Sequence, residues 1–378
     1  MSGYLDELSE KQQGLLDKFG FDREVFEALR DRYAGGDWSP EDNRLKAQVE
    51  QPGEGDIEEL PEPQSQEAER LREVGRQALS KGEVGLLVLN GGMATRFGSV
   101  VKGCVEVFDG QSFLGLKLQD AARWSAPVLL MNSFSTDEAT KAHLEQSDYF
   151  GTDPDRVLDY TQNISLRLTP SGELFGVESD DLLYAPGHGD VAEATRRAAL
   201  EEFQARGGRY LLMSNVDNVL ASLDPLVVGS HIDAAKRDGV EMSVESVDNQ
   251  GSTTGGMPAR VDGQLQVVEA FRFPEGFDAS GIPVYNTNTF IFNADALDQQ
   301  FDLTWFIVEK EVGGRRAIQF ERLAGELSAF LKTRFLQVPR KGKGSRFLPI
   351  KRREDLERNR EFLQTVIEAR RKRATQGS

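Results

Sequence analysis

Residues 86–98 read Leu86-Leu-Val-Leu-Asn-Gly-Gly-Met-Ala-Thr-Arg-Phe-Gly98, and Lys102 follows shortly after them. The apolar run is typical of a buried strand, and it breaks at once into Asn90-Gly91-Gly92. Backbone amides in such a loop can crowd around a phosphate because glycine has no Cβ in the way. Arg96 and Lys102 then supply the positive charge that a triphosphate or pyrophosphate needs. The stretch predicts a phosphate-binding strand and loop.

The spacing of the glycines excludes two common phosphate-binding loops. The dinucleotide pattern G-x-G-x-x-G and the P-loop pattern G-x-x-x-x-G-K-[ST] are both absent from the sequence. The loop therefore belongs to a different class of nucleotide-binding protein.

Composition narrows the class of protein further. The 378 residues are enough for one large α/β core with an appendage, or for two modest domains. A net charge of −17 argues against a general nucleic-acid binder. Neither a membrane-length apolar run nor a signal-peptide pattern is present, and the single Cys104 excludes an internal disulfide. We expect a cytoplasmic protein with neither nucleic-acid nor membrane partners.

The chain before the glycine loop is patterned differently from the rest. Apolar residues recur at helical spacing up to about residue 45, with Ser9 and Asp22 as candidate N-caps. A stretch rich in Pro, Gly and Glu over 51–63 predicts a linker or an extended wrap, and a helix is expected over 66–81. We therefore predict an N-terminal helical extension and linker over 1–65. Residues 66–378 are expected to form the catalytic domain, ending in a basic helical tail.

Beyond the loop, strand and helix signals alternate. Strands are expected at 126–131, 210–213, 240–247, 261–273 and 284–292, and helices at 136–146, 192–205, 225–237 and 317–331. This order predicts a Rossmann-like, mixed but mostly parallel sheet flanked by helices on both faces. Ligands of such sheets bind at the carboxyl ends of the strands, where the informative motifs fall.

Several motifs occur in one order along the chain. They are Leu89-Asn-Gly-Gly-Met-Ala-Thr95 with Phe97-Gly98, Glu106-Val-Phe-Asp-Gly110, Ser112-Phe-Leu114, Leu130-Met-Asn-Ser-Phe-Ser-Thr-Asp-Glu138, Ala185-Pro-Gly-His-Gly-Asp190, Ser214-Asn-Val-Asp-Asn218, Tyr285-Asn-Thr-Asn288 and Arg346-Phe-Leu-Pro-Ile-Lys351. With them the chain resembles the UDP-sugar pyrophosphorylases over about residues 65–357, and among these the UTP–glucose-1-phosphate uridylyltransferases. It departs from the family at Ala94, where glycine is usual, and at Val101, where proline is usual.

The resemblance implies a fold of the nucleotide-diphospho-sugar transferase (GT-A-like) type and a specific reaction. A sugar 1-phosphate oxygen attacks the α-phosphorus of UTP and expels pyrophosphate, which requires positioning and charge neutralisation. Arg96 and Lys102 would hold the β- and γ-phosphates, and Lys351 would reach the sugar phosphate and the α-phosphate. The nucleotide-binding residues implied by the resemblance are Leu89, Asn90, Gly91, Gly92, Thr95, Gln162, Gly187 and Asn215, with Gln162 reading the uracil edge.

Polar residues at the ends of other predicted strands fit the sugar and a metal. Asp217 follows the apolar run that ends at Met213 and is the candidate Mg²⁺ ligand, because Mg²⁺ prefers one or two carboxylates plus phosphate oxygens. The candidate sugar-binding residues are His188, Glu269, Asn286 and Asn288.

A local excess of basic residues between Arg340 and Arg373 has two interpretations. Around Arg346 and Lys351 it suggests a funnel for anionic substrates. For 370–373 it suggests the solvated face of a terminal helix.

Three other functions are weighed against the glucose enzyme. An N-acetylhexosamine-1-phosphate uridylyltransferase would share the fold, but Met93 and Gly187-His188-Gly189 replace its usual landmarks. A transferase that uses a UDP-sugar and Mn²⁺ would need Asp-x-Asp, whereas Asp217-Asn218 offers one carboxylate. A non-catalytic nucleotide-sugar-binding protein is the third. The chain after Lys351 is too short for the C-terminal β-helix domain of larger members, and the sequence leaves the oligomeric state open, a monomer included.

Overall fold

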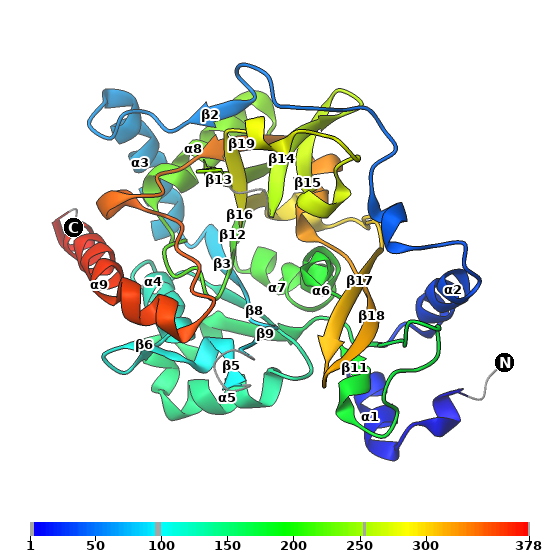
Figure 1. The fold of residues 1–378 in the computed structure, drawn as a ribbon. Coiled ribbons are helices and arrows are strands. Elements are labelled where there is room, and N and C mark those ends of the chain that lie inside the picture. Colours follow the sequence, from blue (N-terminus) through cyan, green and yellow to red (C-terminus); the bar gives the residue numbers. More distant parts are fainter. Residues whose placement is uncertain (1–3, 95–99, 252–254, 377–378) are drawn as a thin grey trace.

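The computed structural model describes residues 4–94, 100–251 and 255–376. An eight-stranded sheet forms its centre (Figure 1). Its strands, in spatial order, are β2 (Ile57–Glu59), β19 (Thr333–Gln337), β13 (Met242–Asp248), β16 (Val284–Asn293), β12 (Tyr210–Asn215), β3 (Val84–Leu89), β8 (Val128–Asn132) and β9 (Val157–Thr161). Only β16 runs antiparallel to its neighbours in this sheet. The predicted mixed, mostly parallel sheet is confirmed.

Helices cover both faces of the sheet. The helices are α1 (Glu10–Lys18), α2 (Arg23–Ala34), α3 (Gln66–Ser80), α4 (Phe113–Ala122), α5 (Asp137–Gln146), α6 (Val191–Ala198), α7 (Leu200–Ala205), α8 (Pro225–Asp238) and α9 (Arg353–Gln376). In β3, Leu86 and Val88 pack towards α3, α4, α8 and α9, whereas Leu87 and Leu89 pack towards α6 and α7. All residues of β3 are buried because each face of the sheet carries its own apolar layer.

The smaller strands lie outside the main sheet and form small sheets of their own. They are β1 (Val49–Glu50), β4 (Met93–Ala94), β5 (Val100–Val101), β6 (Glu106–Phe108), β7 (Gln111–Ser112), β10 (Ser165–Leu166), β11 (Leu183–Tyr184), β14 (Gly256–Val261), β15 (Gln264–Glu269), β17 (Phe306–Val312) and β18 (Arg315–Glu321). Strands β4 and β5, which follow the glycine loop in the sequence, pair with each other, with Ala94 opposite Val100.

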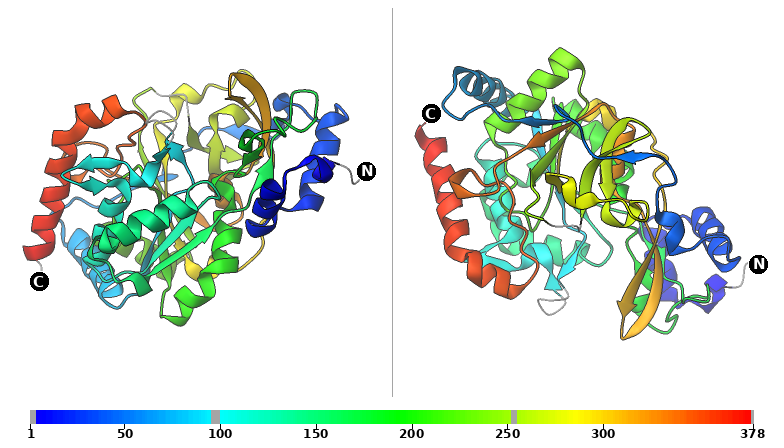
Figure 2. Two further views of the ribbon diagram at one scale, coloured as in Figure 1. Left: turned by 90° about the horizontal axis from the view of Figure 1, so that it is seen from below. Right: turned by 45° about the horizontal axis from the view of Figure 1, so that its top comes forward.

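The N-terminal segment has its own packing surface. The hydroxyl of Ser9 and the carboxylate of Asp22 accept backbone N–H groups at the starts of α1 and α2, as predicted. Both helices pack on β10, β11 and β18, where Trp38 stacks on Phe320 with ring centroids 5.2 Å apart. These helices lie at the end of the molecule opposite α9 (Figures 1 and 2). The stretch expected as a linker or wrap supplies β2, and β1 ends just before it. The domain boundary at residue 65 remains a prediction.

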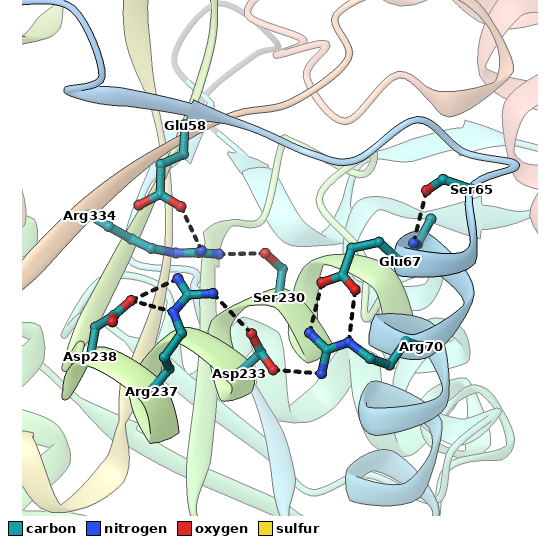
Figure 3. A network of polar contacts seen from close by, with 10 residues as sticks. Glu58, Ser65, Glu67, Arg70, Ser230, Asp233, Arg237, Asp238 and Arg334 are labelled. Carbon is teal, nitrogen blue, oxygen red and sulfur yellow. Dashed lines mark hydrogen bonds and ion pairs between the residues drawn. The ribbon is translucent and has the colours of Figure 1, made fainter.

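Ion pairs fasten α3 to α8 at the edge of the sheet (Figure 3). Arg70 of α3 binds Glu67 of its own helix and Asp233 of α8. Arg334 of β19 donates to Ser230 of α8 and pairs with Glu58 of β2. The network therefore ties β2, the edge strand of the sheet, to β19, and through these residues to α8.

Two predicted elements are wrong. Residues 261–273 are not one strand, because Asp262 and Gly263 turn the chain with positive φ between β14 and β15. Residues 317–331 are not a helix, because β18 pairs in register with β17 as far as Glu321 and a 3₁₀ turn follows over Ala324–Ala329. The predicted helix 192–205 is divided at Ala199 into α6 and α7.

In the part of the chain that the structure describes, none of the helices combines the length and the apolar character that a membrane crossing requires.

Candidate active site

The loops that carry the sequence motifs leave the same edge of the sheet. Hydrogen bonds tie each loop to the end of a neighbouring strand: Asn90 N–H donates to Met131 O (2.8 Å), Gln162 N–H to Asn132 O (3.0 Å) and Val216 N–H to Leu89 O (3.1 Å). The carboxyl ends of β3, β8, β9 and β12 therefore form one rim, where parallel α/β sheets bind ligands.

The Asn90 side chain fixes the start of the glycine loop. It is fully buried, and its Nδ2 donates to Asn132 Oδ1 (2.8 Å) and Thr140 Oγ1 (2.9 Å). Leu89, just before it, is buried in the core. The side chains of these two residues thus support the loop, and their predicted contact with a nucleotide would come from the backbone.

Gly91 and Gln162 touch within the rim. A Cβ on Gly91 would lie 2.1 Å from Gln162 Nε2, so the close approach requires glycine. Gln162 is 6% exposed, and its Oε1 has no hydrogen-bond partner. A buried acceptor without a partner suits the N–H of a bound base. Gly92 faces open space.

We predict that Gly91→Ala raises the KM for UTP about 10-fold, roughly the value of one hydrogen bond, because the added methyl displaces the Gln162 amide. Steady-state kinetics at varied UTP measure the effect. Gly14→Ala is the control, since a Cβ on this exposed residue of α1 meets nothing within 4 Å. Equal KM values for the two variants would contradict this role of Gly91.

Lys102 and Asp217 form an ion pair across the rim. Lys102 begins a short 3₁₀ turn after β5, and Asp217 lies in the turn after β12. Their side chains are only 18% and 13% exposed. The predicted phosphate-binding lysine and the predicted metal ligand thus meet, although 115 residues separate them. Thr95 and Arg96 lie outside the described residues.

Three asparagines gather beside this pair. Asn288 Nδ2 donates to Asn215 Oδ1 (3.0 Å), and Asn286 Oδ1 accepts the Asn288 N–H (2.8 Å). The arrangement depends on a bulge in β16, where the pairing with β13 shifts and Asn288 takes a φ of 54°. The Asn288 side chain thereby reaches Asn215 at the end of β12, while the Asn286 side chain binds the backbone of Asn288.

His188 is held as a neutral donor. Its Nδ1 accepts the Ala324 N–H (3.0 Å), so the proton of the neutral ring lies on Nε2. Burial lowers the pKa of His188 to about 4. Gly187 precedes it with a φ of 92°.

Glu269 ends β15 near the same Ala324–Gly325 corner. A Cβ on Gly256 would lie 2.8 Å from Glu269 Oε1, and one on Gly325 would lie 3.9 Å from it. Burial raises the pKa of Glu269 to about 7. Near neutral pH this carboxyl group can therefore either donate a hydrogen bond to a hydroxyl group or accept one from it.

We predict that the His188 ring titrates near pH 4 and stays neutral at pH 6.5. Because the unfolded chain binds this proton near pH 6.5 and the native ring does not, the free energy of unfolding falls as the pH drops from 6.5 towards 4. Nitrogen-15 NMR of the histidine rings between pH 4 and 8 measures the titration, with His188→Gln to assign the signal. A midpoint between pH 6 and 7 would contradict the buried, accepting Nδ1.

Asp190 and Arg322 form an ion pair that supports the site, and neither was predicted as a site residue. Arg322 Nη2 lies 2.5 Å from Asp190 Oδ1, and Asp190 Oδ2 accepts the Asn163 N–H (3.1 Å) next to Gln162. Asp190 adjoins the Gly-His-Gly motif, which was a usable signal. Arg322 lies in the segment wrongly expected to be a helix and had no local signal.

The basic segment near the C-terminus is only partly available to ligands. Lys351 is exposed, and its backbone N–H donates to Asp355 Oδ2 (3.3 Å). The anion funnel is wrong for Arg346, which is 3% exposed and binds Glu245 through two nitrogens. The prediction that 370–373 form a solvated helix face is wrong for Arg370, because its Nη2 donates to Leu220 O and Ser345 O.

The acidic groups at the rim do not form a metal cage. Within the described ranges, no three His, Cys, Asp or Glu side chains are grouped so that they could hold a metal ion. Asp217, which pairs with Lys102, offers one carboxylate at this rim. Such a site fits a cation that takes most of its ligands from phosphates and water, as Mg²⁺ does.

Known proteins share both the sequence pattern and the fold. A family model described as UTP--glucose-1-phosphate uridylyltransferase matches residues 41–367. UTP--glucose-1-phosphate uridylyltransferase 2 of Dictyostelium discoideum is 30% identical over 72% of this chain, which spans 57% of that relative's length.

Two solved structures show the same fold. A UDP-glucose phosphorylase of Trypanosoma brucei superposes with a TM-score of 0.72 at 22% identity, over 94% of this chain and 78% of its own. The UDP-N-acetylglucosamine pyrophosphorylase of the same organism superposes with a TM-score of 0.71 at 19% identity, over 93% and 79%. The fold alone therefore does not select the sugar.

Proposed function

The chain belongs to the UTP–glucose-1-phosphate uridylyltransferase family, and from this premise we propose that it makes UDP-glucose and pyrophosphate from UTP and glucose 1-phosphate. The observation that carries the proposal is the Lys102–Asp217 ion pair on the rim that also holds Gly91 and Gln162. This ion pair brings together a cation that can bind phosphate and a carboxylate that can bind a metal ion, close in the structure to the end of β3 that carries the glycine loop.

In the proposed reaction, an oxygen of glucose 1-phosphate attacks the α-phosphorus of UTP, and the bond to the β-phosphate oxygen breaks. Pyrophosphate leaves with the negative charge. Lys102 would exchange Asp217 for the β- and γ-phosphates, with Arg96 as a second cation, and Lys351 would approach the α-phosphate. These cations stabilise charge that grows on the leaving group, so no covalent intermediate with the protein is required.

The remaining rim residues would orient the two substrates. The unpartnered Gln162 Oε1 would accept the uracil N–H, beside the loop amides of 90–92 and Gly187. Asn215 would contact ribose or sugar hydroxyls, and Asn286, Asn288, Glu269 and the Nε2–H of His188 would contact the hexose. Amide, carboxyl and imidazole groups that both donate and accept suit a ligand rich in hydroxyls.

Mg²⁺ is the proposed cofactor, with Asp217 as its protein ligand. Asp217 offers one carboxylate beside Lys102, which agrees with the ligand preference of Mg²⁺ when phosphates complete the coordination. A bound Mg²⁺ would neutralise phosphate charge and align the triphosphate. The proposed substrates are small molecules, and the cytoplasmic location remains a prediction.

A pyrophosphate-release assay with a panel of nucleotides and sugar 1-phosphates tests the proposal. We expect turnover with UTP and glucose 1-phosphate that requires Mg²⁺. Turnover with N-acetylglucosamine 1-phosphate alone would instead assign the sister activity. If the protein binds UDP-glucose but turns over none of the substrate pairs, the function would instead be that of a non-catalytic nucleotide-sugar-binding protein.

A further inference from the structure

The turn that carries Asp217 has an unusual backbone environment. Residues 214–223 comprise the last two residues of β12 and most of the connection to α8. This turn is buried: Asn218, Leu220 and Ala221 are each at most 1% exposed. Within it, Asn218 O accepts the Ala221 N–H (3.1 Å) and Ser222 O accepts the Asp224 N–H (2.8 Å). Buried carbonyl groups outside helices and strands otherwise need hydrogen-bond donors from other elements.

Three cationic side chains supply those donors. Lys117 of α4 donates from Nζ to Asn218 O, Ala221 O and Ser214 Oγ, each at 2.7 Å. Arg370 of α9 donates to Leu220 O (2.9 Å) and also to Ser345 O (2.6 Å). Arg346 donates to Ser222 O (3.1 Å). Every carbonyl from Asn218 to Ser222 except that of Val219 is thus bound by a cation.

Burying cations costs free energy, so their presence here needs a compensating role. Burial lowers the pKa of Lys117 to about 7 and that of Arg370 to about 10. Lys117 fills all three of its donor positions, and Arg346 is balanced by Glu245. Asp120 of α4 also binds the turn, because its Oδ2 accepts the Leu223 N–H (2.7 Å).

We propose that Lys117 and Arg370 are positioning residues, which hold the 214–223 turn so that Asp217 faces Lys102. The terminal helix α9 is thereby part of the catalytic unit, although Arg370 lies beyond the residues that the family model matches. Neither side chain contacts Asp217 in the structure. The catalytic consequence rests on the proposed function, whereas the holding of the turn does not.

The consequence follows from geometry. Without Arg370, the carbonyls of Leu220 and Ser345 lose their cationic donor, and the turn can take other conformations. A displacement of about 1 Å in a group that aligns reacting atoms can cost about 100-fold in rate. Partial loosening should cost less, so we expect kcat to fall about 10-fold.

Hydrogen exchange of the ligand-free protein tests the holding role directly. Arg370→Leu is compared with Arg360→Leu, which removes an exposed arginine from the same helix. We expect the amides of 216–223 to exchange at least about 10-fold faster in Arg370→Leu, with β3 and residues 210–213 of β12 unchanged, and wild-type rates in Arg360→Leu. Lys117→Met, nearly equal in length, should loosen the same turn.

Each outcome separates the two claims. Equal exchange of the turn in the Arg370 and Arg360 variants would overturn the proposal, as would faster exchange throughout the core, which indicates general destabilisation. Faster exchange of the turn with an unchanged kcat would overturn the catalytic consequence. Wild-type protein without turnover would overturn the proposed function alone, because the exchange result would still decide whether the cations hold the turn.

Discussion

Lys102→Ala is expected to lower kcat by about 100-fold, the scale of losing one preorganised electrostatic contact to the transition state. In the structure Lys102 is largely buried and engages Asp217, so its ammonium group is fixed in place before substrate arrives. In the proposed reaction negative charge grows on the departing pyrophosphate, and Lys102 is the first described cation that follows the glycine loop in the sequence. The loss should therefore appear in kcat more than in the KM for glucose 1-phosphate.

Initial rates of pyrophosphate release at saturating substrates measure this effect. Lys81→Ala is the control, because Lys81 is exposed at the end of α3 and should leave the rate unchanged. Lys102→Arg tests geometry, since a guanidinium keeps the charge but presents it differently. A kcat within a factor of two of wild type for Lys102→Ala would remove this residue from the mechanism.

Asp217→Asn is expected to lower kcat by about 100-fold and to raise the Mg²⁺ concentration needed for half-maximal rate. An asparagine keeps the shape of the side chain but loses the charge that pairs with Lys102 and that a hard cation prefers. Rates measured over a range of Mg²⁺ concentrations give both values. Calorimetric titration of UTP with Mg²⁺ and with EDTA adds a readout that does not depend on turnover.

The control for this variant is Asp17→Asn, an exposed carboxylate of α1 on the N-terminal helices. An unchanged Mg²⁺ requirement in Asp217→Asn would contradict the role of metal ligand. Because Lys102 and Asp217 contact each other, the double variant should lose less than the product of the two single losses.

Local pattern was sufficient to predict much of the fold. The buried runs that became β3, β8 and β12 are apolar on both faces, and the N-caps Ser9 and Asp22 begin the helices expected of them. Residues 317–331 failed because their apolar spacing fits two periods, and pairing with β17 decided between them. Such long-range pairing leaves no mark in a short window of sequence.

The site was predicted less evenly. The glycine-loop stretch and the motif at 214–218 supplied Lys102 and Asp217, and the fold brought these two into contact, whereas Gln162 came from the family resemblance. The interpretation of Arg346 failed because a basic excess says nothing about burial, and Glu245 lies 101 residues away in the sequence. Lys117 could have been found, since a lone lysine between Leu116 and Leu118 is conspicuous. The predicted roles of Thr95 and Arg96 remain predictions.

The central claim is that the glycine loop and Lys102 hold the phosphates of UTP while Asp217 binds the metal ion beside them. A crystal structure of the protein with UTP and Mg²⁺ tests this claim most directly. The account predicts the β- and γ-phosphates within hydrogen-bond distance of Lys102 and of the loop at 90–92, with Mg²⁺ between them and Asp217. A triphosphate bound away from residues 90–102 would contradict it.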